Sequence, residues 1–221
     1  MEIGNNKILE NSLFWDKRIT KKKSSSYQLL MHCSQTKLSY CIFHAEKKEL
    51  LGTNAHLFNS TNTLQKILEK DIFNWNYESI KINLDSNKST IVPNSFFDKK
   101  IIEKYLYFNE KFNKQEVDFF CDELKYMDAA VISSMPKKLT ALLERKFKKI
   151  KIQSHSSIFI DSILRKCAQS KENEIFIDLS TNRFDIGVVK QSKLFLYNNF
   201  TCLSKNDFLY YILNCYNTLN L

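Results

Sequence analysis

The sequence predicts an α/β protein in which one unit, three strands followed by a helix, occurs twice. Three short apolar segments between Tyr27 and Phe58, separated by polar turns, precede a stretch with helical periodicity. The same order returns between Glu174 and Leu219. With 221 residues, 43% of them hydrophobic, the chain is long enough for one large or two small domains with a packed core.

Residues 1–26 are expected to form an irregular lead-in that ends in an exposed polar loop, Lys21–Ser26. Residues 27–170 form the first predicted lobe. Its first three strands are the segments YQLLMHC, KLSYCIFHA and ELLGTNAHLF. The middle segment is apolar on both faces, which favours a central position in the sheet. Thr61 or Asn62 is expected to cap the helix that follows.

Further strands and helices complete the first lobe. Short apolar runs and alternating patterns predict strands at 79–84, 91–92, 117–124, 129–136 and 149–154. Helices are expected from about Asp98, after Pro136, and from a cap at Ser156 or Ser157, while Asn109–Glu116 forms a polar loop.

Residues 171–221 begin a second lobe, with strands EIFIDLSTN, RFDIGVVK and KLFLYNNF. Lys190–Lys193 is expected to join the last two strands, and Gly187 to permit close packing of a helix. Ser204 and Asp207 predict a capping box at the start of the final helix. That helix carries an apolar stripe, and further apolar residues widen it: Phe208, Ile212, Cys215 and Leu219, then Leu209, Leu213 and Tyr216. We expect this lobe to be incomplete.

The two three-strand segments, YQLLMHCSQTKLSYCIFHAEKKELLG and EIFIDLSTNRFDIGVVKQSKLFLYNNF, resemble the repeated halves of the actin, hexokinase and Hsp70 superfamily. More narrowly, STIVPNSFFDKKIIEKYLYFN and SKNDFLYYILNCYNTL resemble an uncharacterised bacterial family, a domain of unknown function assigned an actin-like ATPase fold. The resemblance spans roughly Leu38 to Leu219. It implies a duplicated actin-like, ribonuclease-H-like fold with mixed sheets. Pilus-assembly and cell-division members of the superfamily bind ATP, and other relatives act as scaffolds.

The resemblance directs attention to two turns that correspond to the superfamily's Asp- and Gly-rich phosphate loops. The turn Ser34–Lys37 contains neither Asp nor Gly, and the whole chain holds only 3 glycines. The second turn keeps an acid, and the candidate nucleotide-binding residues are Asp178, Ser180 and Thr181. Asn182 can adopt the left-handed backbone conformation there. In the alternative interpretation, Asp178 and Thr181 only hydrogen-bond the turn itself.

Other classes of site find no support in the sequence. The four histidines lack the paired spacing of zinc ligands, so we expect structural or surface roles, with no metal site and no catalytic residues. We expect no secretory leader, because no basic segment leads into an apolar stretch near residue 1, and no apolar run reaches the ~20 residues that span a bilayer. The six scattered cysteines favour a reducing cytoplasm.

The net charge of +9 comes largely from two basic clusters, at 17–23 and 145–151. We interpret them as solvated faces, because no nucleic-acid-binding motif accompanies them. The predicted function is that of a non-catalytic interaction or scaffold protein with a protein partner and no cofactor. Two alternatives stay open: a conformational switch that binds ATP with magnesium, and a basic nucleic-acid-binding module.

Overall fold

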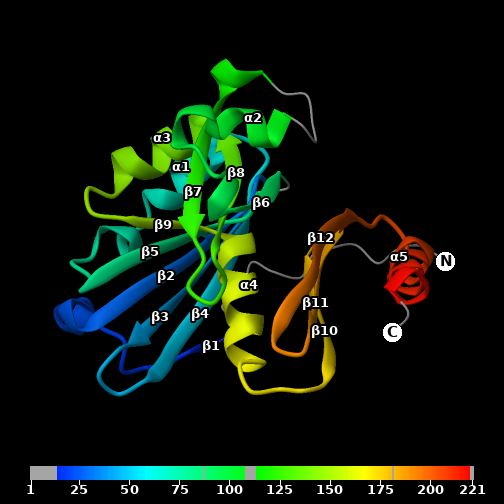
Figure 1. Cartoon of the computed structure of the whole chain (residues 1–221). Coiled ribbons are helices and arrows are strands. Elements are labelled where there is room, and N and C mark those ends of the chain that lie inside the picture. The colour runs from blue at the N-terminus through cyan, green and yellow to red at the C-terminus, as the bar shows by residue number, and fades with distance from the viewer. Residues whose placement is uncertain (1–13, 87, 108–112, 181, 220–221) are drawn as a thin grey trace.

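The computed structural model describes residues 14–86, 88–107, 113–180 and 182–219 of the chain. They form three sheets with helices packed against them (Figure 1). The largest sheet has six strands in the order β1-β4-β3-β2-β5-β9. Its strands are β1 (Phe14–Trp15), β2 (Tyr27–Cys33), β3 (Lys37–His44), β4 (Glu49–Leu57), β5 (Ser79–Leu84) and β9 (Lys151–Ser154).

The six-stranded sheet combines an antiparallel meander with two parallel additions. β2, β3 and β4 are antiparallel, whereas β5 pairs with β2 in parallel and β9 pairs with β5 in parallel. Helices α1 (Thr61–Leu68) and α3 (Lys137–Lys146) pack against each other and contribute Leu64 and Leu143 to the core of this sheet. The parallel arrangement brings the carboxyl ends of β2, β5 and β9 to the same edge of the sheet.

A second sheet lies between β5 and β9 in the sequence. Its order is β6-β8-β7, with β6 (Ser89–Pro93), β7 (Val117–Glu123) and β8 (Ala129–Pro136) all antiparallel. Helix α2 (Ile102–Tyr107) packs on it through Leu106. The central strand β8 is buried from Ala129 to Met135, which explains its continuous run of small and apolar residues.

The third sheet repeats the order of the first lobe's meander and confirms the expected repeat. It contains β10 (Asn173–Ser180), β11 (Arg183–Lys190) and β12 (Lys193–Thr201), followed by α5 (Lys205–Leu219). The capping box at α5 is also confirmed. The Asp207 N–H donates to Ser204 Oγ at 3.1 Å, and the Ser204 N–H donates to Asp207 Oδ2 at 2.9 Å.

Helix α4 (His155–Lys166) runs between the large sheet and the third sheet (Figure 1). It contacts β5 and β9 of the first lobe and β11 and β12 of the second. A Cβ atom at Gly187 of β11 would lie 2.3 Å from Ile163 Cδ1 and 3.1 Å from Phe159 Cε1. This confirms that Gly187 permits the close approach of a helix, and that helix is α4.

Within the described residues no helix is long and apolar enough to cross a membrane. Part of the predicted lead-in and part of the loop Asn109–Glu116 lie outside the described residues. The run predicted as an exposed loop, Lys21–Ser26, is a 3-10 helix with Ser24 buried, and β1 extends the large sheet at β4. The lobe boundaries at residues 27 and 171 remain predictions.

Three other local predictions are wrong. Ser60 caps α1, because its Oγ accepts the Thr63 N–H at 3.2 Å. Helix α4 already begins at His155, so Ser156 and Ser157 lie buried in its first turn. The residues predicted to widen the apolar stripe of α5 are exposed, namely Leu209, Leu213 and Tyr216. The stripe itself packs on the third sheet as expected.

Gly187→Ala is expected to lower the free energy of unfolding by about 1–3 kcal/mol, because the new methyl group overpacks the contact between β11 and α4. Urea denaturation at neutral pH measures the change. Lys193→Ala on the exposed surface of β12 is the matched control and is expected to change stability little. Equal stability of both variants would contradict close packing at Gly187.

Candidate functional site

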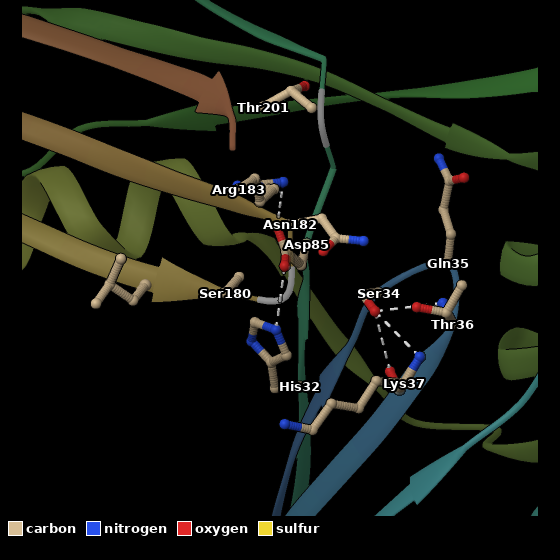
Figure 2. A pocket seen from close by; sticks show the side chains of 11 residues that line it. His32, Ser34, Gln35, Thr36, Lys37, Asp85, Ser180, Asn182, Arg183 and Thr201 are labelled. Carbon is tan, nitrogen blue, oxygen red and sulfur yellow. Dashed lines mark hydrogen bonds and ion pairs between the residues drawn. The ribbon is translucent and has the colours of Figure 1, made fainter. Parts of the chain in front are cut away.

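A cavity of about 570 Å³ lies between the two lobes, within the size range of small-ligand sites. Two turns face each other across it, the one joining β2 to β3 and the one joining β10 to β11 (Figure 2). These are the two turns that the sequence matched to phosphate loops. The lining residues are His32, Ser34, Gln35, Thr36, Lys37, Asp85, Leu179, Ser180, Asn182, Arg183 and Thr201.

The first turn engages three of its own backbone N–H groups, those of Ser34, Thr36 and Lys37. Ser34 Oγ accepts the N–H of Thr36 at 3.3 Å and the N–H of Lys37 at 3.1 Å, as Figure 2 shows. The Ser34 N–H donates to the Lys37 carbonyl at 2.9 Å. A phosphate loop presents such N–H groups to its ligand. Here the N–H groups of Ser34, Thr36 and Lys37 are engaged within the turn.

The second turn passes through Asn182, whose φ of 60° confirms the left-handed conformation expected there. The Asn182 carbonyl accepts the Cys202 N–H at 2.8 Å, which ties the turn to the end of β12. Arg183 follows at once and opens β11. Its side chain turns toward Asp85 on the opposite lobe (Figure 2).

The Arg183 guanidinium joins the two lobes through a pair of buried ion pairs. It lies 2.7 Å from Asp85 Oδ1, just after β5, and 2.6 Å from Asp185 Oδ2 on β11. The three side chains are at most 8% exposed. Burial raises the pKa of Asp85, but the hydrogen bond from His32 and the Arg183 charge outweigh it, so this pKa lies below its ordinary value.

A second connection between the lobes joins His155, the first residue of α4, to Asp178 on β10. His155 Nε2 lies 2.9 Å from Asp178 Oδ2, and the imidazole meets His32 edge to face at 5.4 Å between ring centroids. Burial lowers the pKa of His155, but the hydrogen bond to Asp178 and the charges of Asp185 and Asp85 outweigh it, so this pKa lies above its ordinary value.

Neutral hydroxyl groups extend this network into the second sheet. The Tyr197 hydroxyl donates to Asp185 Oδ1 at 2.7 Å and lies 2.6 Å from Ser156 Oγ, which in turn lies 2.8 Å from Ser89 Oγ on β6. Burial and the Asp185 charge raise the pKa of Tyr197, which keeps its proton in place for this bond. The network therefore connects all three sheets through α4.

The three residues predicted to bind nucleotide differ in where they lie relative to the cavity. Ser180 lines the cavity. Asp178 is half-exposed beside it, and its carboxylate is bound to His155. Thr181 lies outside the described residues. Their role in nucleotide binding stays a prediction.

Sequence reasoning did not single out the residues that dominate this site. Arg183 was not among the candidate nucleotide-binding residues, and the histidines were expected to have structural or surface roles. One signal was available. His32, Asp85 and His155 stand at or just beyond the carboxyl ends of β2, β5 and β9, which are neighbouring parallel strands. Polar residues at such strand ends meet at one edge of the sheet, where α/β folds bind ligands.

The fold and the paired turns place the chain in the class of proteins with an actin-like ATPase fold. A protein of unknown function with this fold from Bacteroides thetaiotaomicron superimposes with a TM-score of 0.83 at 20% identity, over 92% of this chain and 80% of that one. The chain belongs to the family described as "Protein of unknown function (DUF3822)", whose model matches residues 16–221.

Other structural similarities are remote. An Aquifex aeolicus Ppx/GppA phosphatase gives a TM-score of 0.40 at 7% identity, over 79% of this chain and 52% of that one. The PilM–PilN type IV pilus biogenesis complex gives 0.42 at 11% identity, over 86% of this chain and 66% of that one. No curated protein matches the sequence. These remote similarities carry no argument about activity, so the function is argued from the site.

Arg183→Met is expected to lower the free energy of unfolding by about 3–5 kcal/mol, because it leaves two buried carboxylates without their cation. Arg18→Met is the matched control, because it removes an exposed guanidinium from Asp16 and is expected to change stability little. Urea denaturation compares both with the parent chain. A loss at Arg183 no greater than that at Arg18 would contradict the buried cluster.

The His155–Asp178 bond predicts a pH-dependent stability. The pKa of His155 is raised above 6.5, so its contribution is complete below that pH and is lost as pH rises through the raised value. The pKa of Asp178 is lowered below 3.8, so its contribution is present above that pH and is lost as pH falls through the lowered value. The bond therefore stabilises the fold most between pH 3.8 and 6.5.

We expect His155→Gln to destabilise the chain more at about pH 5.5 than at about pH 9, as measured by urea denaturation. Asp178→Asn tests the same bond from its other side and is expected to give the same trend over this range. A destabilisation by His155→Gln that does not change with pH would show that the imidazole contributes by packing alone.

Proposed function

We propose that this chain is a non-catalytic interaction protein, a scaffold on the actin-like fold whose partner is another protein. The observation that carries the proposal is the buried Arg183 guanidinium between Asp85 and Asp185 at the base of the cleft. The positive charge of this guanidinium already pairs with the carboxylates that a metal–nucleotide complex would need.

The other polar groups of the cleft support the same proposal. Magnesium requires oxygen ligands or a hydration shell held by carboxylates, yet Asp178 is engaged by His155 and Asp85 by both Arg183 and His32. The amides that would hold a phosphate are bonded within the Ser34–Lys37 turn. As arranged, these residues do not fit magnesium-bound ATP.

A second candidate function is a conformational switch that binds ATP with magnesium. The cavity of about 570 Å³ between the two turns favours it, because the cavity lies between the lobes and is lined by Lys37. In this candidate the His155–Asp178 bond has to open before the carboxylate can turn to the cavity. Opening and closing of two lobes around a ligand is an established kind of switching transition.

Calorimetric titration of the parent chain with ATP and magnesium separates the two candidates. If the protein is a scaffold, no saturable binding is expected at ATP concentrations up to about 1 mM. The free energy of ATP binding is then less favourable than about −4 kcal/mol. The matched variant is Asp178→Ala, which is expected to behave in the same way. Saturable binding by the parent chain that Asp178→Ala abolishes would overturn the scaffold and establish the switch.

A further inference from the structure

A groove of about 270 Å³ lies between helices α1 and α3 on the surface of the first lobe (Figure 1). Two side chains of α1 and four of α3 line it, namely Thr61, Gln65, Lys138, Ala141, Leu142 and Arg145. The four residues of α3 follow the spacing i, i+3, i+4 and i+7, which places them along one face of that helix. The groove shares no lining residue with the cleft between the lobes, so it is a separate surface feature.

The α3 wall of the groove has apolar residues between two cations. Lys138 and Arg145 are two helical turns apart, about 10.5 Å along the axis, and Ala141 and Leu142 stand between them. The lining residues include no carboxylate, and within the described part of the chain neither cation forms an ion pair. The Arg145 guanidinium donates only to the neutral Gln65 Oε1, at 3.4 Å. Both cations therefore keep their charge available to an anionic ligand.

The position of Lys138 shows that the charge of this wall does not serve the helix itself. A cation in the last turn of a helix interacts favourably with the helix dipole, which accounts for Arg145. Lys137 and Lys138 stand instead in the first turn of α3, where the same dipole favours acids. Neither α1 nor α3 has an acidic residue in its first turn. An anion bound in the groove would offset this unfavourable arrangement.

The two basic clusters of the sequence meet beside the groove. The 3-10 helix Asp71–Asn74 lies between them. Lys21 of the first cluster donates to Asp71 Oδ1 at 2.7 Å, and Lys146 of the second cluster donates to Asn74 Oδ1. Lys146 directly follows the second cation of the groove, and all the other cations of both clusters are exposed. The groove therefore continues into a larger basic surface.

Charge and chemistry together favour an acidic polypeptide over a nucleic acid as the occupant. Single-stranded nucleic acids bind by stacking their bases on aromatic side chains. Within the described residues, no exposed aromatic side chain belongs to α1, to α3 or to the 3-10 helix between the two clusters. Phosphates would also leave Ala141 and Leu142 without an apolar partner. A polypeptide supplies both carboxylates and apolar side chains.

We propose that this groove binds an acidic, amphipathic helix of a protein partner. The inference rests on the proposed function and specifies where and by what chemistry the partner is bound. Two carboxylates seven residues apart on a helix span the same distance of about 10.5 Å as Lys138 and Arg145. Apolar side chains three and four residues after the first carboxylate then cover Ala141 and Leu142. An amphipathic helix that lays its apolar face into a groove is a recurring mode of recognition.

Fluorescence anisotropy with a labelled model peptide tests the proposal. The peptide is an alanine-based helix of about 20 residues, with Glu at positions i and i+7 and Leu at i+3 and i+4. We expect the parent chain to bind it saturably at low salt, and more weakly as the salt concentration rises. A second peptide of identical composition carries its leucines on the opposite face. It is expected to bind at least about tenfold more weakly, because it leaves the apolar residues of the groove uncovered.

Variants of the chain locate the binding surface. Lys138→Glu combined with Arg145→Glu is expected to weaken binding of the first peptide at least about tenfold, because like charges then face each other. The matched control, Lys193→Glu combined with Lys205→Glu, lowers the net charge equally on the second lobe and is expected to bind like the parent chain. Ala141→Gln fills the groove without changing the charge and is also expected to weaken binding. All five positions are exposed, so the fold is expected to persist, which circular dichroism checks.

Three results would overturn the groove: no binding by the parent chain, equal binding of both peptides, or an equal loss in the two double variants. A single-stranded oligothymidylate of about 10 nucleotides is the last ligand. If it binds more tightly than the peptide and the Lys138→Glu, Arg145→Glu variant loses it, the surface binds nucleic acid and the proposal fails.

The groove and the proposed scaffold can fail independently. Saturable ATP binding that Asp178→Ala abolishes, with peptide binding intact, would overturn the scaffold and leave the groove. No peptide binding together with no ATP binding would overturn the groove and leave the scaffold.

Discussion

The arrangement of the two lobes depends on one buried cation. Arg183 stands on the second lobe, and its guanidinium reaches Asp85 on the first while holding Asp185 on its own strand. Three charged side chains are removed from water together, and none of them is stable there without the others. Because Asp85 directly follows β5 and Arg183 opens β11, this contact fixes how closely the two sheets approach around α4.

The same contacts determine what the cleft can do. A ligand site works best when its polar groups are held in place but still have bonding capacity for the ligand. In this cleft the carboxylates are already paired with cations, and Ser34 already accepts the amides of its own turn. The groups that a nucleotide would need are engaged in the interactions that hold the lobes together, and this is the basis of the proposed scaffold role.

Local patterns were enough to predict most of the fold, and not enough to predict the site. The strands of both meanders, the Ser204–Asp207 capping box and the role of Gly187 follow from alternation, turn residues and steric demand over short stretches. The ion cluster joins Asp85 and Arg183, which are far apart in the sequence, so no local pattern pairs them. His155 was predicted as structural or surface because its neighbours lack metal-ligand spacing. Its place after a parallel strand was the informative feature.

The apolar pattern of α5 shows what sequence periodicity alone does not predict. Periodicity indicates correctly that Leu209, Leu213 and Tyr216 are apolar on one flank, but it does not indicate what covers them. We predicted burial within the lobe, and the structure leaves this flank exposed beside the edge of β10. In the first lobe α1 packs against α3. The period of a sequence pattern therefore identifies an apolar flank, whereas the neighbour that covers such a flank is set by the tertiary fold.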